Sequence, residues 1–489
     1  MSRSHLKTHA IASDIWTALS LPPAALPSLH LPSSDDTLAL PSSFKIGPLA
    51  QASIGASALA AALYRTHRAG LSPESTPSVT VPLHHAAIEF KSERYHWLDD
   101  WDANPPQPFL NTLGGLHAAA GNGYVRIHDA FPNHVRGTLE ILGLPPTATR
   151  EDIAAKVATW DAVELETRGT QDGNVAIYAL RSYDEWDALP QSSAIANQPI
   201  LLRQLTPSST PKHIASPPPN PTQCLSGLRV LELSRVIAAP IAGRTLAAHG
   251  ADVLWVTSPN LPDLPVLDKD TSRGKRTIQL DLNHPADKAH LLELLRTCDV
   301  FLQSYRPGSL VAKGLSPEEL SKLNPGIICA NLSAFGPTGP WSTRRGFDSL
   351  VQTCTGMNVS EAQHAGKGEA ARAMPCQALD HASGYLLAAG ISAALYHRSV
   401  SGGSWVVDVS LAGTMKYLRS LGQYEWDSGF AATAVGELKR EELPREMVEV
   451  REAGFGRMTA VRHAASVETC EVGYGEMPKP LGSDVAEWK

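Results

Sequence analysis

One aspartate stands at the start of a long apolar segment, in "LDHASGYLLAAGISAALYHR" (379–398). Asp380 and His381 are followed by sixteen residues, 382–397, that carry no formal charge. The length and alanine content of this run predict a buried helix. Asp380 could cap that helix by accepting hydrogen bonds from free backbone N–H groups. It could instead be a nucleophile, kept ionised by the same N–H groups and the helix dipole. The segment by itself leaves both roles open.

Two cationic motifs could bind an anionic ligand. "TSRGKR" (271–276) places three cations within four residues, and Arg and Lys are the side chains that bind phosphate groups. "QSYRPGSLVAKGL" (303–315) follows a predicted strand, the usual position of ligands in open α/β sheets. There Tyr305 could stack on a purine and Arg306 could contact a phosphate. Solvated basic turns remain the alternative for both motifs.

The elements that would position these residues alternate between strand and helix. Short Val/Leu/Ile-rich runs at 228–234, 251–257, 299–305 and 326–335 are typical of strands buried on both faces of a parallel sheet. Helical patterns occupy 240–250 and 284–298 between them. We therefore expect an α/β fold with a doubly wound, Rossmann-like parallel sheet and a smaller α/β domain. No GxGxxG, GxSxG or GxxxxGK[ST] motif is present, so nicotinamide, flavin, serine-hydrolase and P-loop sites have no support.

A proline-rich stretch divides the chain. Residues 206–222 contain six prolines and no hydrophobic periodicity, which predicts an extended linker. The predicted domains are an N-terminal irregular or helical segment (1–79), a small α/β domain (80–205), the linker (206–222), a Rossmann-like domain (223–420) and a C-terminal segment (421–489).

Composition and charge indicate which kinds of binding partner and which environment suit this protein. The net charge of −7 and the pI near 6.2 argue against nucleic acid or an anionic membrane as the main partner. We find no apolar run approaching the roughly 20 residues that span a bilayer. The six cysteines are scattered without CxxC spacing, which favours reduced thiols and no structural metal site. A cytoplasmic protein is the expectation.

The order and spacing of motifs after Leu225 are more specific than any one of them. "LSGLRVLELSRVIAAPIAGRTLAAHGADVLWV", "RGKRTIQLDL", "SYRPGSLVAKGLSPEEL", "GFDSLVQTCTG" and "LDHASGYLLAAGISAALYHR" follow one another without a break. This region, about 223–415, resembles the large domain of the family III CoA-transferases, the CaiB/BaiF group. "NGYVRIHDAFPNHVRGTLEILGL" and "RSYDEWDALPQ" resemble the family's small domain, placed here ahead of the large one.

The resemblance implies a reaction and a set of residues. Asp380 matches the family's nucleophile, which attacks an acyl-CoA thioester to form a mixed anhydride and then an aspartyl-CoA thioester. Coenzyme A would be a substrate, not a permanently bound cofactor, and a carboxylic acid would be the acceptor. Backbone N–H groups near the helix start would stabilise the oxyanions. A homodimer is expected. The implied CoA-binding residues are Arg235, Arg273, Lys275, Arg276, Tyr305 and Arg306.

Departures from the family pattern keep alternatives open. Ser258 stands where a basic residue often contacts CoA, and Ile237 stands where many transferases have a polar residue. These changes leave room for a diverged lyase or isomerase that does not use CoA. The α-methylacyl-CoA racemases of the same fold are another alternative, but Phe347 in "GFD" stands in the place of their second acid/base histidine. Since phenylalanine carries no proton, a racemase-like enzyme would lack one of its two bases.

Overall fold

The centre of the protein is a mostly parallel sheet. The computed structural model describes residues 2–32, 38–99, 112–172, 175–207, 221–431 and 436–489. Six neighbouring strands run parallel and β7 pairs antiparallel with β13 at one edge. The order is β10 (Arg276–Gln279), β9 (Asp252–Thr257), β8 (Arg229–Leu233), β11 (Val300–Gln303), β12 (Ile328–Ser333), β13 (Ser404–Ser410) and β7 (Ile200–Thr206). The predicted doubly wound sheet is confirmed.

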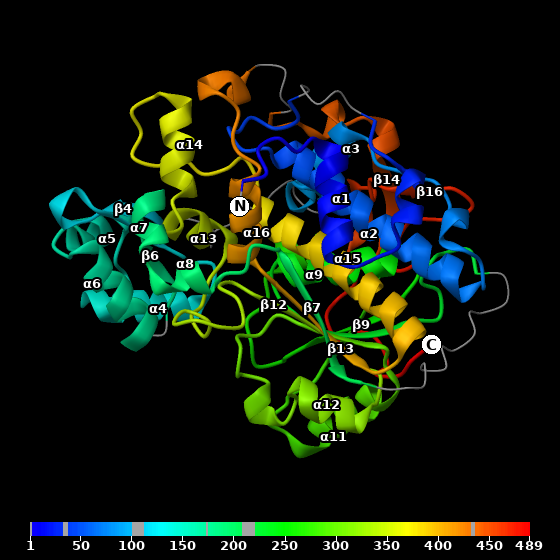
Figure 1. Cartoon of the computed structure of the whole chain (residues 1–489). Helices are drawn as coiled ribbons and strands as arrows, with labels where there is room; N and C mark the ends of the chain where they lie inside the picture. Colours follow the sequence, from blue (N-terminus) through cyan, green and yellow to red (C-terminus); the bar gives the residue numbers. More distant parts are fainter. Residues whose placement is uncertain (1, 33–37, 100–111, 173–174, 208–220, 432–435) are drawn as a thin grey trace.

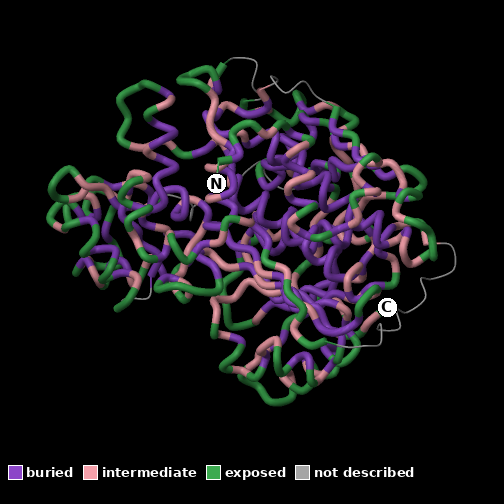
Figure 2. The backbone as a smooth tube through the Cα atoms, viewed as in Figure 1, coloured by how far each residue is buried: buried purple, intermediate pink, exposed green. Residues whose placement is uncertain are grey.

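Helices cover both faces of this sheet, as its buried apolar strands require. One face packs against α9 (Ala238–Ala248) and α15 (Ala378–Ser401), and α2 (Ile46–Arg68) lies over α15 (Figure 1). The other face packs against α11 (Pro285–Thr297) and α12 (Pro317–Leu323). Figure 2 shows buried chain through the centre and exposed chain at the periphery.

The strand order reverses between β8 and β11. From β8 the chain crosses to β9 on one side, and it later returns to β11 and β12 on the other. At such a switch point the loops leave in opposite directions and open a crevice beyond the carboxyl ends of the strands. The functional site is therefore expected beyond Leu233 and Gln303.

Helix α2 is a core helix of unusual composition. It has 23 residues and is long and apolar enough, by length and composition, to cross a bilayer. The prediction that the chain contains no apolar segment of this length was therefore wrong. Of its most apolar window, 94% is buried inside the protein. The helix is rich in Ala, Gly and Ser, and Gly55 lies against Leu29 and Leu31, where a side chain would be crowded. Small side chains let α2 pack closely on α15 and fill the interior.

A smaller α/β unit has its own core. Its antiparallel strands β4 (Gly115–Ala118), β5 (Tyr124–Ile127) and β6 (Ile177–Ala179) pack against helices α4, α5 and α6. These helices span Pro132–Leu142, Arg150–Val157 and Ala162–Thr167. We call the described residues between 113 and 179 the small lobe.

Strand pairing joins regions that are far apart in sequence. β7 belongs to the large sheet, and β3 (His96–Leu98) pairs with β15 (Gly456–Val461), which pairs with β14 (Val448–Ala453). β2 (Val79–Thr80) lies between β1 (Leu29–His30) and β16 (Ser466–Val467). The predicted domain limits are therefore crossed by shared sheets, and most of the predicted linker lies outside the described residues. The remaining α-helices are α1 (Thr8–Ala18), α3 (Leu83–Glu89), α7 (Tyr183–Asp187), α8 (Pro190–Ala194), α10 (Pro265–Thr271), α13 (Asp348–Cys354), α14 (Met357–Ala365) and α16 (Leu411–Ser420).

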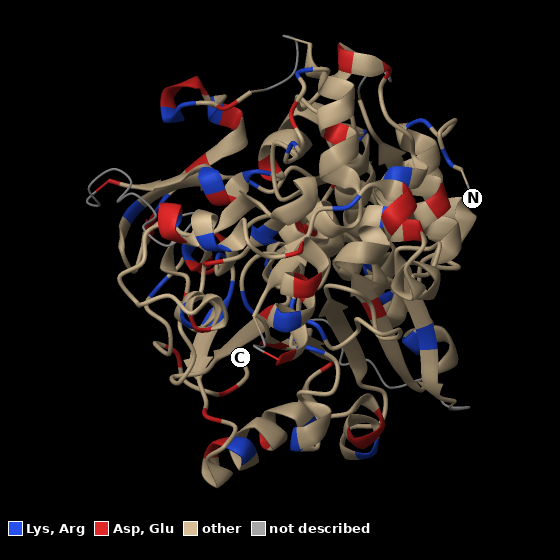
Figure 3. Cartoon of the chain, turned by 90° about the vertical axis from the view of Figure 1, so that its left-hand side faces the viewer, with Lys and Arg blue, Asp and Glu red and all other residues tan. Residues whose placement is uncertain are grey.

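Charged residues of both signs are interspersed along the chain (Figure 3). Several pairs are internal: Arg244 with Asp270, Arg181 with Glu166 and Lys275 with Glu232 are all nearly inaccessible. Such pairs connect elements that pack together, as Arg244 of α9 and Asp270 of α10 do.

Candidate active site

A cavity of about 360 Å³ lies at the predicted switch point. Its walls come from the loops after β8, β11 and β12, from the start of α9 and from the first turn of α15. The small lobe adds the segment around α4. The polar and charged side chains that line it include His134, Arg235, Tyr305, Arg306, Arg345 and Asp380.

Asp380 is the carboxylate of this cavity. It is the third residue of α15, and no hydrogen bond to its carboxylate is found among the described residues. The capping task belongs to Asp348, at the start of α13. Its Oδ2 accepts hydrogen bonds from the backbone N–H groups of Leu379 (2.8 Å) and Asp380 (3.0 Å). Asp380 is therefore not the cap of α15: a second aspartate caps this helix, and Asp380 lines the cavity.

The surroundings of Asp380 favour its neutral form. Burial raises the pKa of the Asp380 carboxyl well above its usual range, and the carboxylates of Asp348 and Glu93 raise it further. Burial also raises the pKa of Asp348, to about 6, although its backbone hydrogen bonds oppose the shift. An ionised Asp380 therefore needs a higher pH or a ligand that supplies donors or positive charge.

Three of the six predicted CoA-binding residues line the same cavity as Asp380. Arg235 follows β8, where its guanidinium lies 4.5 Å from the Phe131 ring and donates to the Pro262 carbonyl. Tyr305 and Arg306 follow β11, and Arg306 donates to the Thr343 carbonyl at 3.3 Å. The fold thus brings a carboxylate, a phenol and guanidinium groups around one space.

The other three predicted residues are elsewhere, which corrects the expectation for the "RGKR" motif. Arg273 is fully buried and donates to Asp270 at 2.6 Å. Lys275 is paired with Glu232 at 2.7 Å, with both side chains inaccessible. Arg276 is paired with Asp252 at 2.8 Å and lines a separate hollow at the amino-terminal ends of the strands. Each cation is paired with a carboxylate, and none of the three lines the cavity of Asp380.

The sequence did not reveal the contribution of the small lobe. Phe131, Asn133 and His134 line the cavity. Burial, together with the charges of nearby arginines, lowers the pKa of His134 to about 4, so its imidazole is neutral at pH 7. Phe347 also lines the cavity, and its ring stacks on the half-buried His128 with centroids 3.7 Å apart. No spacing in the sequence links these residues to Asp380.

The start of α9 offers backbone donors. Ala238 and Ala239 line the cavity, and no side chain caps this helix. The preceding Val236 has φ of 74°, a left-handed conformation that is strained for a β-branched residue. Strain of this kind persists where surrounding structure imposes it, and it often marks functional loops. The turn after β8 directs the uncapped helix end towards the cavity.

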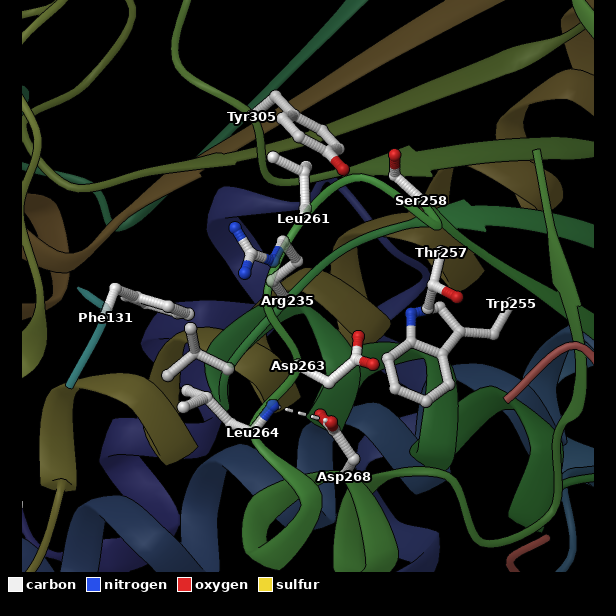
Figure 4. Close-up of a pocket in the computed structure, with 11 residues that line it drawn as sticks. Phe131, Arg235, Trp255, Thr257, Ser258, Leu261, Asp263, Leu264, Asp268 and Tyr305 are labelled. Carbon is white, nitrogen blue, oxygen red and sulfur yellow. Dashed lines mark hydrogen bonds between the residues drawn. The ribbon is translucent and has the colours of Figure 1, made fainter. Parts of the chain in front are cut away.

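Towards β9 the crevice becomes acidic. Figure 4 shows Asp263, Asp268, Trp255 and Ser258 lining this part of the crevice beside Arg235 and Tyr305, with the Arg235 guanidinium directed towards Phe131. Burial raises the pKa of Asp268 to about 7, while its carboxylate accepts the Leu264 N–H at 3.0 Å. Ser258 stands where a basic residue was expected from the resemblance, and the carboxyl groups of Asp263 and Asp268 lie in the same part of the crevice.

Comparison with known proteins shows which family this chain resembles in sequence. A profile described as CoA-transferase family III matches residues 225–472, more than half of the chain. The "Probable fatty acyl-CoA transferase Rv3272" of Mycobacterium tuberculosis is 36% identical over 208 residues, covering 40% of this chain and 52% of the relative. The "Acetyl-coenzyme A transferase nodX" of Hypoxylon pulicicidum is 30% identical over 307 residues, covering 59% and 51%. A crystal structure of Rv3272 covers 41% of this chain and 59% of its own, at 33% identity and a TM-score of 0.38. The chain spans about half the length of the curated relatives it matches.

Proposed function

Because the chain belongs to CoA-transferase family III, we propose that it transfers CoA from an acyl-CoA thioester to a carboxylic acid through Asp380. The observation that carries this proposal is the position of Asp380. Its carboxyl group lines the cavity at the carboxyl ends of the parallel strands, while Asp348 performs the capping.

The proposed reaction proceeds through two kinds of covalent intermediate. The Asp380 carboxylate attacks the thioester carbonyl, which expels CoA thiolate and forms a mixed anhydride. The thiolate then attacks the Asp380 carbonyl carbon, which releases the first acid and leaves an aspartyl-CoA thioester. The acceptor carboxylate attacks this thioester and expels the thiolate, which finally takes the new acyl group and frees Asp380. Each step exchanges one acyl bond for another, so no oxidant or external proton donor is needed.

The ligand-binding roles follow from the lining of the cavity. Arg235 and Arg306 carry the positive charge that CoA phosphates require, and Tyr305 offers a ring for the adenine. The backbone N–H groups at the start of α15 were expected to stabilise the oxyanions, but those of Leu379 and Asp380 already donate to Asp348. We assign oxyanion stabilisation to the uncapped start of α9, at Ala238 and Ala239.

The test is Asp380→Asn, with an acyl-CoA and intact-mass measurement. The unmodified chain should gain the mass of an acyl or CoA adduct, and Asp380→Asn should remain folded, lose turnover and gain no adduct, because an amide is a poor nucleophile. Asp161→Asn is the matched control, since Asp161 caps α6 in the small lobe and lies outside the cavity. Normal turnover in Asp380→Asn would reject the proposal.

The acidic side of the crevice supports a second candidate, a diverged enzyme that acts on a ligand without CoA phosphates. Asp263 and Asp268 would repel phosphate groups placed near Ser258 (Figure 4). A calorimetric titration of the unmodified chain with CoA separates the candidates. Saturable binding supports the transferase, and no heat of binding at millimolar CoA supports the diverged enzyme.

A further inference from the structure

A buried histidine beside Asp380 is held by a carboxylate from a distant segment. We propose that Glu93 is a positioning residue for Asp380, acting through His381, and that Arg273 of the "RGKR" motif helps to hold the Glu93 segment in place. This inference rests on the proposed role of Asp380 as the nucleophile. It assigns a task to a motif that the cavity does not use.

The contact between Glu93 and His381 is direct and dry. His381 Nε2 lies 2.8 Å from Glu93 Oε2, and the two residues are 0% and 8% exposed. Because a carboxylate only accepts hydrogen bonds, Nε2 carries the proton. Phe90 stacks on the imidazole with centroids 5.4 Å apart. The His381 ring is therefore fixed by one hydrogen bond and one ring contact, both from the segment that follows α3.

The first turn of α15 is thus anchored from two sides. Asp348, from α13, accepts the backbone N–H groups of Leu379 and Asp380. Glu93, from the short helix η3 (Ser92–Arg94), holds the side chain of the next residue. Asp380 lies between these anchors and faces the cavity. Attack on a thioester depends on the placement of the nucleophile, and a displacement of 1 Å can cost about a hundredfold in rate.

A buried network in turn holds η3. The Ser92 hydroxyl donates to Asp270 Oδ2 at 2.7 Å, and Arg244 donates to the same oxygen at 2.6 Å. Arg273 donates to the other carboxylate oxygen at 2.6 Å. Ser92, Asp270, Arg244 and Arg273 are all 0% exposed. A buried carboxylate with two guanidinium partners is costly to separate, so Ser92, and with it Glu93, has a defined position.

The charge of Glu93 also affects the pKa of Asp380. The carboxyl groups of Asp348 and Glu93 both face the start of α15, and both raise the pKa of Asp380 beyond the effect of burial. His381 bonds to Glu93, and Arg94 lies 3.8 Å from it. Glutamine at position 93 keeps an acceptor for His381 and removes the charge. Alanine removes both.

The experiment measures the rate at which the covalent adduct forms on Asp380, by quenched intact-mass measurement in a single turnover at several acyl-CoA concentrations and pH values. Glu93→Ala should slow acylation about tenfold or more with little change in the half-saturating acyl-CoA concentration, because placement is lost and ground-state binding is kept. Glu93→Gln should retain most of the rate, and its acidic limb should move to lower pH because a negative charge near Asp380 is gone. Glu437→Gln is the control: Glu437 pairs with Lys91 and Arg94 but is 63% exposed.

The outcomes separate this inference from the proposed function. Acylation by Glu93→Ala at the unmodified rate, or by Glu93→Gln with an unmoved acidic limb, would overturn the inference and leave Asp380 as the nucleophile. Absence of any adduct in the unmodified chain would reject the proposed function. If Glu93→Ala does not fold, as circular dichroism would show, the pH profile of Glu93→Gln decides.

Discussion

At the scale of single residues, two neighbouring aspartates have different tasks. Asp348 and Asp380 are both buried, yet only Asp348 accepts backbone hydrogen bonds from α15, and only Asp380 lines the cavity. Burial raises the pKa of Asp380, and the carboxylates of Asp348 and Glu93 raise it further, whereas the backbone N–H groups at the start of α15 oppose the rise at Asp348. The capping position and the cavity-lining position at the start of α15 thus belong to two different aspartates.

The capping role of Asp348 predicts a stability difference between two substitutions. Asp348→Asn keeps an oxygen that can accept the N–H groups of Leu379 and Asp380. Asp348→Ala leaves these buried donors without an acceptor, and it should lower the free energy of unfolding by about 1–3 kcal/mol more than Asp348→Asn does. Urea denaturation followed by circular dichroism measures the difference. Equal midpoints for the two variants would contradict the role.

The pKa of Asp348 predicts how stability depends on pH. Its folded-state pKa of about 6 lies above the usual value of 3.8. Its neutral form therefore favours folding, and this contribution is full below about pH 4 and lost as the pH rises through about 6. Asp348→Asn should gain stability relative to the unmodified chain between pH 4 and about 7. Thermal midpoints across that range measure the effect, and parallel curves would count against it.

At the scale of elements, the position of a cation in the fold decides what it does. Arg306 lies in the loop after β11 and lines the cavity, whereas Lys275 precedes β10 and is paired with Glu232 in the interior. Both motifs look alike in the sequence, since each is a short cationic segment beside a strand. Only the loop after β11 leads into the crevice at the switch point.

Charge reversal should therefore have opposite consequences at these two positions. Lys275→Glu places two carboxylates together in the core and should cost about 3–5 kcal/mol of stability or prevent folding. Arg306→Glu should fold with an unchanged melting temperature and weaken CoA binding at least about tenfold. Thermal denaturation and calorimetric titration measure the two effects. A folded Lys275→Glu variant that has lost only CoA affinity would restore the first interpretation of the motif.

At the scale of the whole molecule, the cavity combines two parts of one chain. The large sheet supplies Asp380, Arg235 and Arg306, and the small lobe supplies Phe131 and His134. The lobe is held there by contacts such as Tyr178, whose hydroxyl donates to the Arg345 carbonyl at 2.5 Å. Access to Asp380 therefore depends on how the lobe sits against the loops beyond the strands.

The homodimer stays a prediction that comes from the family resemblance. Sedimentation velocity at micromolar concentration should show twice the 52.3 kDa mass of the chain. A single species of the chain mass would contradict it. If that species also forms the adduct on Asp380, one chain suffices for the first half of the reaction.

The sequence by itself determined the main elements and singled out Asp380 as the candidate nucleophile. Runs of branched apolar residues predicted the parallel strands, and the long uncharged segment after His381 predicted α15, because such patterns depend on near neighbours in the chain. Only the tertiary structure decided which charges are available to a ligand. Lys275 meets Glu232 across 43 residues, Arg273 meets Glu449 across 176, and His381 meets Glu93 across 288. A buried ion pair leaves no periodic pattern in the sequence, because its partner is set by how the elements pack and not by the residues beside it.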